Sequence, residues 1–220
     1  MNSIKRKKFN VSLLGEAQVG KTSIFSVKSG FPFNPNQLAT VGIENFLDKE
    51  IFNGTQYIFK IFDTAGQERY NTIVASTTKV ADGYVLVFSV DQKSSLDKIT
   101  AWYKYLEDNV NIKEKGIVLI GNKIDIKERE VSKEEGENFA KSLNIKYFET
   151  SAKDGIGINE AFKYIYKEIY ELNEKAGLED ENNNEEIQKD KNVKNNNNIE
   201  LNKKDHIKDN NIERKKGCSC

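Results

Sequence analysis

One stretch decides the fold of this chain: Gly15-Glu16-Ala17-Gln18-Val19-Gly20-Lys21-Thr22. Its spacing, a glycine, four residues and then Gly-Lys-Thr, is that of a phosphate-binding P-loop. Residues 9–14 before it, Phe-Asn-Val-Ser-Leu-Leu, predict a buried strand, and the residues from Lys21 to about Lys28 predict a helix. Backbone N–H groups at such a turn bind anions, Lys21 reaches terminal phosphates, and the Thr22 hydroxyl ligates Mg²⁺. The alternative is a glycine turn with an incidental lysine.

The composition excludes several classes of protein. Among 220 residues, 34 are basic and 34 acidic, so no overall basic field argues for nucleic-acid binding. The two cysteines, Cys218 and Cys220, form no disulfide framework, which fits a reducing compartment. No apolar run approaches the length of a bilayer span, the N-terminal residues lack the apolar segment of a secretory signal, and Asn2 excludes N-myristoylation. Any membrane contact is therefore expected to use the cysteines.

Strand and helix patterns alternate along the chain. Two β-branched and aromatic runs flank Asn53-Gly54 and predict a hairpin over 43–62. Ser94 and Ser132 are the predicted N-caps of two later helices. The further predicted strands are 83–90, 116–121 and 145–150, and the predicted helices are 73–80, 94–109, 132–143 and 158–172.

This alternation predicts an α/β fold: a P-loop NTPase with a six-stranded, mostly parallel sheet and helices on both faces. We expect residues 1–8 to form a flexible basic arm and 9–173 to form the folded domain. Asparagine, lysine and glutamate dominate 174–220, which predicts a disordered tail. Ligands of such sheets lie beyond the carboxyl ends of the strands, so the P-loop, Asp63, Asn122 and Ser151 are expected to meet there.

The turn that begins at Asp63 carries the second group of candidate residues. A carboxylate after this strand holds Mg²⁺, usually through water. The Gly66 N–H is expected to contact a terminal phosphate, and Gln67 is placed to orient an attacking water. The alternative is an ordinary strand-to-loop turn with polar side chains.

The segment Asn122-Lys123-Ile124-Asp125 predicts which base is bound. The Asp125 carboxylate matches the N1–H and amino donors of guanine, which adenine lacks, and a wrong base would leave that carboxylate unpaired. The Lys123 stem is expected to pack along the base plane. The alternative is a charged loop.

Three further segments complete the predicted site. In Ser151-Ala152-Lys153, the Ala152 N–H is expected to reach guanine O6 and Ser151 to brace the loop. Thr40 is a candidate second hydroxyl ligand for Mg²⁺. Phe33 is a candidate to stack against the base edge, with core packing as the alternative.

These motifs together resemble the Ras superfamily of small GTPases, over residues 9 to about 172. Thr40-Val-Gly-Ile-Glu, the run from Asp63 to Tyr70 and the terminal Cys-Ser-Cys resemble its Rab branch. The resemblance implies a G domain with GTP or GDP as bound nucleotide, Mg²⁺ held by Thr22, Thr40 and Asp63, and Gln67 as the catalytic residue. The implied nucleotide contacts are Gly15, Ala17, Gln18, Val19, Gly20, Lys21, Thr22, Ser23, Phe33, Thr40, Gly66, Asn122, Lys123, Asp125, Ser151, Ala152 and Lys153.

The resemblance also implies partners and a location. Segments 34–46 and 64–80 become switches I and II, which recruit effectors when GTP is bound. The expected partners are an exchange factor, a GTPase-activating protein, a prenylation escort and a GDP-dissociation inhibitor, around a monomeric GTPase. Cys218 and Cys220 resemble a double geranylgeranylation signal, which predicts a lipid anchor on the cytoplasmic face of an intracellular membrane, a cytosolic pool and a role in vesicle traffic. Free thiols or zinc binding are the alternatives for these cysteines.

Some residues depart from the Rab pattern. Ala17 stands where Ras proteins have glycine and many Rabs serine, so its methyl group is expected near the γ-phosphate and to slow hydrolysis modestly. Asn45 replaces an aromatic residue, Thr77-Thr78 a tyrosine pair and Phe62 a tryptophan, and we expect Asn45 and the threonine pair on the surface that effectors contact. The alternatives to a trafficking switch are a hydrolysis-poor GTP-binding scaffold, a GTPase with a signalling role, and a phosphotransferase, which would need an arginine-rich lid.

Overall fold

The computed structural model of this chain describes residues 7–37, 43–64 and 72–177. Residues 1–173 belong to one compact unit and 174–220 to a second, of which the described residues, 174–177, are helical. All elements that follow belong to the first unit.

The described residues form a single six-stranded sheet with the order β2-β3-β1-β4-β5-β6. β2 runs antiparallel to β3, and every other neighbouring pair is parallel. This confirms the predicted six-stranded, mostly parallel sheet. The strands are β1 (Lys8–Leu14), β2 (Ile43–Phe52), β3 (Thr55–Thr64), β4 (Gly83–Ser89), β5 (Gly116–Asn122) and β6 (Lys146–Thr150).

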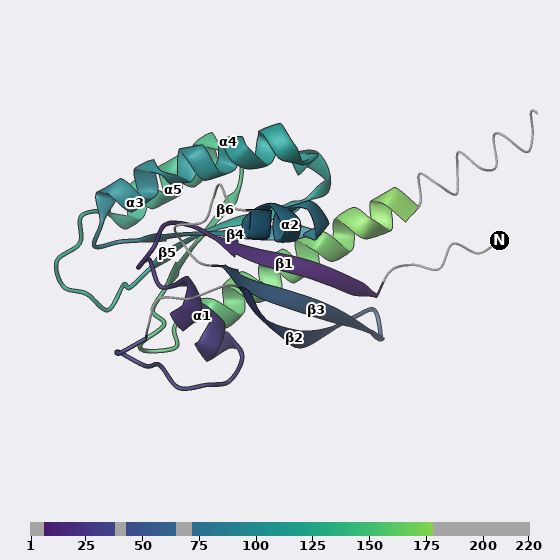
Figure 1. Cartoon of the computed structure of the whole chain (residues 1–220), viewed down its shortest axis with the longest axis horizontal. Helices are drawn as coiled ribbons and strands as arrows, with labels where there is room; N and C mark the ends of the chain where they lie inside the picture. Colours follow the sequence, from purple (N-terminus) through teal and green to yellow (C-terminus); the bar gives the residue numbers. More distant parts are fainter. Residues whose placement is uncertain (1–6, 38–42, 65–71, 178–220) are drawn as a thin grey trace, which may run out of the picture. The chain divides into compact units, whose positions relative to one another are not determined.

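Helices cover both faces of this sheet (Figure 1). On one face lie α3, α4 and α5, and on the other lie α1 and the last helix, which begins at residue 158 and runs to the end of the unit. The bounds are α1 (Lys21–Lys28), α2 (Thr72–Val80), α3 (Lys93–Asp97), α4 (Ile99–Asn109), a short 3₁₀ turn (Ile112–Glu114) and α5 (Lys133–Ser142).

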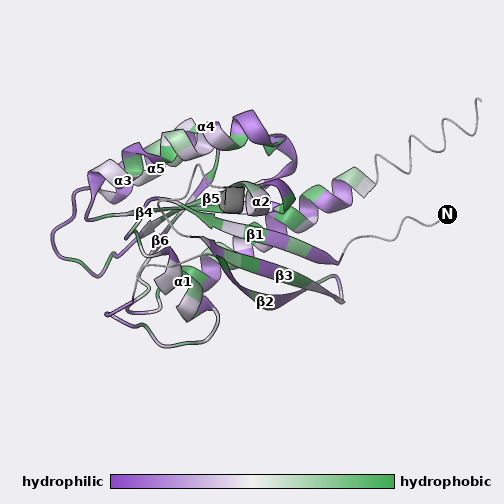
Figure 2. Ribbon diagram, in the orientation of Figure 1, coloured by the Kyte–Doolittle hydropathy of each residue, from purple (hydrophilic) through white to green (hydrophobic). Residues whose placement is uncertain are grey.

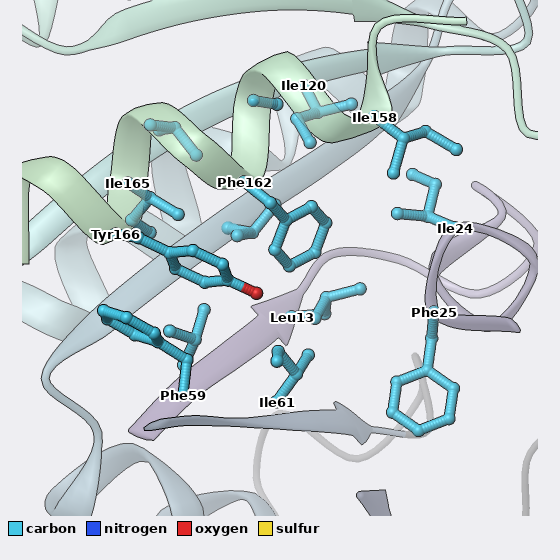
Figure 3. Packing of buried hydrophobic residues seen from close by; sticks show 14 of the residues in the cluster. Leu13, Ile24, Phe25, Phe59, Ile61, Ile120, Ile158, Phe162, Ile165 and Tyr166 are labelled. Atoms are coloured by element: carbon cyan, nitrogen blue, oxygen red, sulfur yellow. The ribbon is translucent and has the colours of Figure 1, made fainter. Parts of the chain in front are cut away.

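The two covered faces hold two buried clusters of hydrophobic side chains. In the first, Phe162 and Tyr166 of the last helix and Ile24 of α1 pack over the sheet, and the Tyr166 ring stacks on Phe59 with centroids 4.0 Å apart (Figure 3). In the second, Trp102 of α4 packs with other buried side chains of β4, β5 and α5. Each helix carries both hydrophobic and hydrophilic residues (Figure 2), as expected for helices that cover a sheet with one side and face solvent with the other.

The central strands β4 and β5 are buried at every residue. Tyr84, Leu86 and Phe88 of β4 contribute to the second cluster, whereas Val85 and Val87 contribute to the first. Such a strand needs apolar residues on both sides, which explains why the sequence shows an unbroken apolar run there.

One predicted helix is two helices in the structure. Residues 94–109 divide at Lys98 into α3 and α4, and the N-cap of α3 is Gln92 rather than Ser94. The neighbouring Ser95 is the serine that fixes this start: its hydroxyl donates to the Gln92 carbonyl oxygen at 2.6 Å and accepts from the Ser89 N–H. By contrast, the predicted cap of α5 is confirmed, since Ser132 Oγ accepts a hydrogen bond from the Glu135 N–H.

The expectation that the threonine pair lies on the surface is wrong. Thr77 and Thr78 are 4% and 1% exposed, because they occupy the side of α2 that faces the sheet. The hydroxyl of Tyr84 on β4 donates to the Thr78 carbonyl oxygen at 2.6 Å. Asn45, in contrast, is exposed as expected.

Candidate nucleotide site

The loop between β1 and α1 depends on two glycines. Gly15 has a φ of +148°, and a Cβ there would lie 2.2 Å from the Val87 carbonyl oxygen. Gly20 is the N-cap of α1 with a φ of +96°, and its Cβ would lie 2.3 Å from Asn122 Nδ2. The chain therefore makes this turn only with glycine at both positions, and the turn begins α1 at Lys21.

Lys21 is held inside this loop. Its side chain is buried, and Nζ donates to the carbonyl oxygens of Gly15 at 3.0 Å and Glu16 at 2.9 Å. Burial lowers the pKa of Lys21 to about 8, although the charges of Asp63 and Glu16 act in the opposite direction. An anion bound at the loop would favour the charged ammonium and so offset the cost of burial, which fits the predicted phosphate contact of Lys21.

The side-chain oxygens of Thr22 and Asp63, two predicted Mg²⁺ ligands, lie next to each other. Thr22 Oγ1 donates to Asp63 Oδ2 at 2.7 Å, and the Asp63 side chain is fully buried at the carboxyl end of β3. Hydroxyl and carboxylate oxygens are the ligands that Mg²⁺ prefers. This pair therefore fits the predicted magnesium site.

Asn122, the last residue of β5, joins three segments. Its Nδ2 donates to the Val19 carbonyl oxygen at 3.0 Å, and its Oδ1 accepts from Thr150 Oγ1 at 3.0 Å and from the Ala152 N–H at 3.3 Å. All of these bonds are buried. The phosphate loop, the end of β5 and the loop after β6 are therefore fixed to one another, as the carboxyl-end argument predicted.

Asp125 is braced by the loop after β6. Ser151 Oγ donates to Asp125 Oδ1 at 2.7 Å and accepts from the Asp154 N–H at 3.0 Å. Lys153 Nζ lies 3.8 Å from Asp125 Oδ2. Ser151 thus has the bracing position that the sequence suggested, and Asp125 has a fixed orientation.

The comparisons with known proteins agree with this geometry. The Ras family model matches residues 10–171. The chain is 35% identical over 159 residues to Ras-related protein Rab-18 of Lymnaea stagnalis, covering 72% of this chain and 79% of that protein. It is 35% identical over 162 residues to Ras-related protein Rab-8A of Bos taurus (73% and 78%), and 34% identical over 161 residues to Ras-related protein SEC4 of Saccharomyces cerevisiae (73% and 74%).

The chain belongs to the Ras family of small GTPases, in its Rab branch. Members of this family bind GTP and GDP and hydrolyse GTP to GDP, and the same holds for this Rab-type GTPase. Within the described residues, no helix is long and apolar enough to cross a membrane.

Two ion pairs near the site of this Rab-type GTPase were not predicted from the sequence. Lys123 Nζ lies 3.3 Å from Asp91 Oδ2. Burial acts to raise the pKa of Asp91, but the Ser89 hydroxyl and the Lys123 ammonium hold it below its ordinary value. Asp91 follows the carboxyl end of β4, so the rule that pointed to Asp63 would have found it. The other pair, between Lys98 Nζ and Glu16 Oε2 at 3.3 Å, joins α3 and α4 to the phosphate loop and has no signal in the sequence.

The remaining predicted site residues differ in how far they are buried, and some lie outside the described residues. Phe33 is partly buried and packs against the first cluster, so the packing alternative describes its observed contacts, while base stacking stays a prediction. Ala17 and Ser23 are partly exposed, and Gln18 is exposed with a φ of 65°. Five predicted site residues lie outside the described part of the chain: Thr40, Gly66, Gln67, Cys218 and Cys220.

Proposed function

We propose that this protein is a guanine-selective molecular switch of the Rab type, with slow intrinsic hydrolysis that a GTPase-activating protein accelerates. The observation that carries the proposal is the set of hydrogen bonds at Asn122, which fixes the phosphate loop against the two segments that would bind the base. A nucleotide bound here contacts all three segments at once, so its phosphates and its base are recognised by one rigid frame.

Guanine selectivity is assigned to Asp125. Ser151 holds one carboxylate oxygen at 2.7 Å, which supports an Asp125 carboxylate that would accept from the N1–H and amino donors of guanine. Adenine has no matching pair of donors, and it would leave a desolvated carboxylate unpaired. Lys123, held by Asp91, supplies an apolar stem for the base plane.

The γ-phosphate is the proposed signal. Lys21 supplies charge, Thr22, Thr40 and Asp63 hold Mg²⁺, the Gly66 N–H contacts the terminal phosphate, and Gln67 orients the attacking water. The magnesium ion would neutralise charge that develops on the phosphate oxygens. The Ala17 methyl group would lie beside this reaction and slow hydrolysis modestly.

We further propose that the switch acts on an intracellular membrane in vesicle traffic. Two geranylgeranyl chains on Cys218 and Cys220 would give stable anchoring, at about 0.8 kcal/mol per buried CH₂. A prenylation escort, a GDP-dissociation inhibitor, an exchange factor and effectors at switches I and II complete the cycle around a monomer. The Rab names of the relatives support this assignment.

The decisive experiment measures nucleotide selectivity and turnover in the full chain. We expect GTP to bind at least 100-fold more tightly than ATP, and Asp125→Ala to remove most of that preference, on the order of 2–3 kcal/mol. Multiple-turnover phosphate release is expected from the wild type and not from Gln67→Leu. Equal rates of phosphate release from the wild type and Gln67→Leu would contradict the switch proposal and favour the hydrolysis-poor scaffold. Localisation of a Cys218→Ser/Cys220→Ser variant tests the lipid anchor separately.

A further inference from the structure

We propose that the outer face of the β2–β3 hairpin docks an acidic, amphipathic segment of a partner protein, whichever nucleotide is bound. This hairpin outer face consists of Lys8, Leu47, Lys49, Ile51, Ile58 and Lys60. The proposal goes beyond the switch function, whose effectors respond to GTP.

The strand register places these six side chains together. Leu47 pairs with Lys60 and Lys49 with Ile58, while Ile58 also pairs with Lys8 on β1. Residues that pair directly across neighbouring strands point to the same face of a sheet, and residues two apart on a strand do the same. Ile58 is therefore flanked by Lys49 and Lys8, with Lys60 two residues along its own strand.

The opposite face of the hairpin is covered. Phe46 packs edge-on against Phe25 of α1 at 5.1 Å, and Phe52 stacks on Tyr170 of the last helix at 4.7 Å. The outer face has no such cover: Leu47 and Ile51 are 62% and 64% exposed. Neither they nor Ile58 belong to the two buried clusters of the described residues. Adjacent exposed apolar side chains mark interaction surfaces more often than single ones do.

The charge of this face is of one sign. No carboxylate of the described residues forms an ion pair with Lys8, Lys49 or Lys60. The acidic residues of the same strand alternate to the covered face, where Asp48 pairs with Lys28 at 2.5 Å. Lys60 Nζ lies 4.9 Å from the centre of the Phe62 ring. Apolar contacts beside unpaired ammonium groups fit a segment that offers leucine-like anchors and carboxylates.

Protection of a sheet edge does not account for these lysines. A lysine on an edge strand discourages pairing between copies of a protein, and Lys49 on β2 would serve this purpose. Lys60 and Lys8, however, lie on β3 and β1, which are interior strands. Three strands contribute cations to one face, so the feature belongs to the face and not to the edge.

The hairpin is anchored away from the predicted γ-phosphate contacts. Its ladder contains ten residue pairs, from Ile43 with Thr64 to Phe52 with Thr55. On the outer face, Leu47 and Lys60 form the fifth of these pairs, and the pair of Lys49 and Ile58 lies nearer the turn. The turn end of the hairpin is tied to the last helix through Tyr170, whereas Thr40 precedes Ile43 and Gln67 follows Thr64 in the sequence, at the other end of the ladder's two strands. Loss of the γ-phosphate therefore leaves this face in place.

The test uses the full chain loaded with GDP or with a non-hydrolysable GTP analogue. The probe is a fluorescein-labelled peptide of about 14 residues with the repeat Glu-Glu-Leu-Leu, a pattern that puts carboxylates and leucines alternately along each side of an extended segment. The control probe has the repeat Lys-Lys-Leu-Leu. Fluorescence anisotropy is expected to show binding in the range of tens of micromolar for the acidic peptide only, and the same affinity within about twofold in the two nucleotide states.

Three double variants locate the binding site, and the two that replace lysines change the net charge by the same amount. Lys49→Glu/Lys60→Glu is expected to weaken binding by about tenfold or more, as is Leu47→Ser/Ile51→Ser. Lys104→Glu/Lys113→Glu, which changes exposed lysines elsewhere by the same charge, is expected to leave binding unchanged. The rate of GDP release reports whether each variant stays folded, because these residues do not contact the nucleotide site.

Three outcomes would overturn the proposal. The first is equal binding by the two lysine double variants. The second is a difference of about tenfold between the GDP and GTP-analogue states, which would make this face part of the switch. The third is binding of phosphatidylserine vesicles through Lys49 and Lys60 with no binding of the acidic peptide, which would assign the face to a membrane. Loss of guanine selectivity would refute the switch function without touching this result.

Discussion

Asn122 Nδ2 donates a hydrogen bond to the carbonyl oxygen of Val19 at 3.0 Å, across 103 residues of sequence. This bond fixes the end of β5 to the phosphate loop. It also explains the glycine at position 20, whose Cβ would lie 2.3 Å from the same nitrogen. The Asn122 side chain therefore joins the phosphate loop, through Val19, to β6 and the loop after it, through Thr150 and Ala152.

Replacement of Asn122 by alanine is expected to loosen the whole site. The Val19 carbonyl, the Thr150 hydroxyl and the Ala152 N–H would each lose a partner. The free energy of unfolding should fall by about 2–3 kcal/mol. Release of a fluorescent GDP analogue should be at least tenfold faster, on the scale of one lost buried contact.

A graded control is available at Thr150. Thr150→Val removes one donor to Asn122 and keeps the bond to Val19, so its effect on GDP release should be clearly smaller. If the two variants release GDP at the same rate, the bond to Val19 is not what holds the loop.

Nucleotide binding is expected to take up a proton at mildly alkaline pH. Burial lowers the pKa of Lys21 to about 8, so part of the population is neutral at pH 8.5. Negative phosphates favour the ammonium form and raise this pKa again, so binding draws a proton from solution. Calorimetry in two buffers of different ionisation enthalpy measures this uptake at pH 8.5 and should find little at pH 6.5.

The matched control for this measurement is Lys21→Arg. A guanidinium stays charged throughout this range, so the arginine variant should show no such uptake. Uptake of the same size in the variant would assign the proton to another group.

The pair of Lys28 and Asp48 should make stability depend on acid pH. Burial acts to raise the pKa of Asp48, but Lys28 and the Tyr166 hydroxyl, at 2.9 Å, hold it below its ordinary value. A lowered carboxyl pKa stabilises the fold above the unfolded value, and the contribution is lost as pH falls through the folded value. Asp48→Asn should therefore cost about 1–2 kcal/mol at pH 7 and progressively less below about pH 4.

Urea unfolding at a series of pH values measures this difference. Asp97→Asn, at an exposed carboxylate of α3, serves as the control and should leave the pH profile unchanged. A constant difference between wild type and Asp48→Asn from pH 7 to pH 3 would contradict the assignment of this pair.

Ala17→Gly is expected to speed GTP hydrolysis severalfold, which corresponds to about 1 kcal/mol of barrier. The reason is the Ala17 methyl group, which we expect near the γ-phosphate, where it would restrict the approach of water. Single-turnover phosphate release from preloaded protein measures the rate, with GDP release as the control for binding. No gain in rate would remove the proposed effect of Ala17.

Much of the fold could be predicted from the sequence because its signals are local. The unbroken apolar runs of β4 and β5 predicted strands buried on both faces, and Asn53-Gly54 predicted the hairpin. The P-loop spacing predicted both the turn and the helix after it. Ser94 misled the prediction, since a serine near a helix start is a cap only if the backbone begins there, and here Ser95 bonds to Ser89.

The sequence by itself determined the order of the elements, the mostly parallel sheet and the edge at which the motifs meet. Periodicity and turn residues suffice for that, because each depends on neighbours in the chain. Only the tertiary structure decided how the motifs are joined: Asn122 to Val19, Lys123 to Asp91 and Glu16 to Lys98. The same holds for the cationic outer face of the hairpin. These relationships depend on strand register and on distances between residues far apart in the chain, which no local pattern specifies.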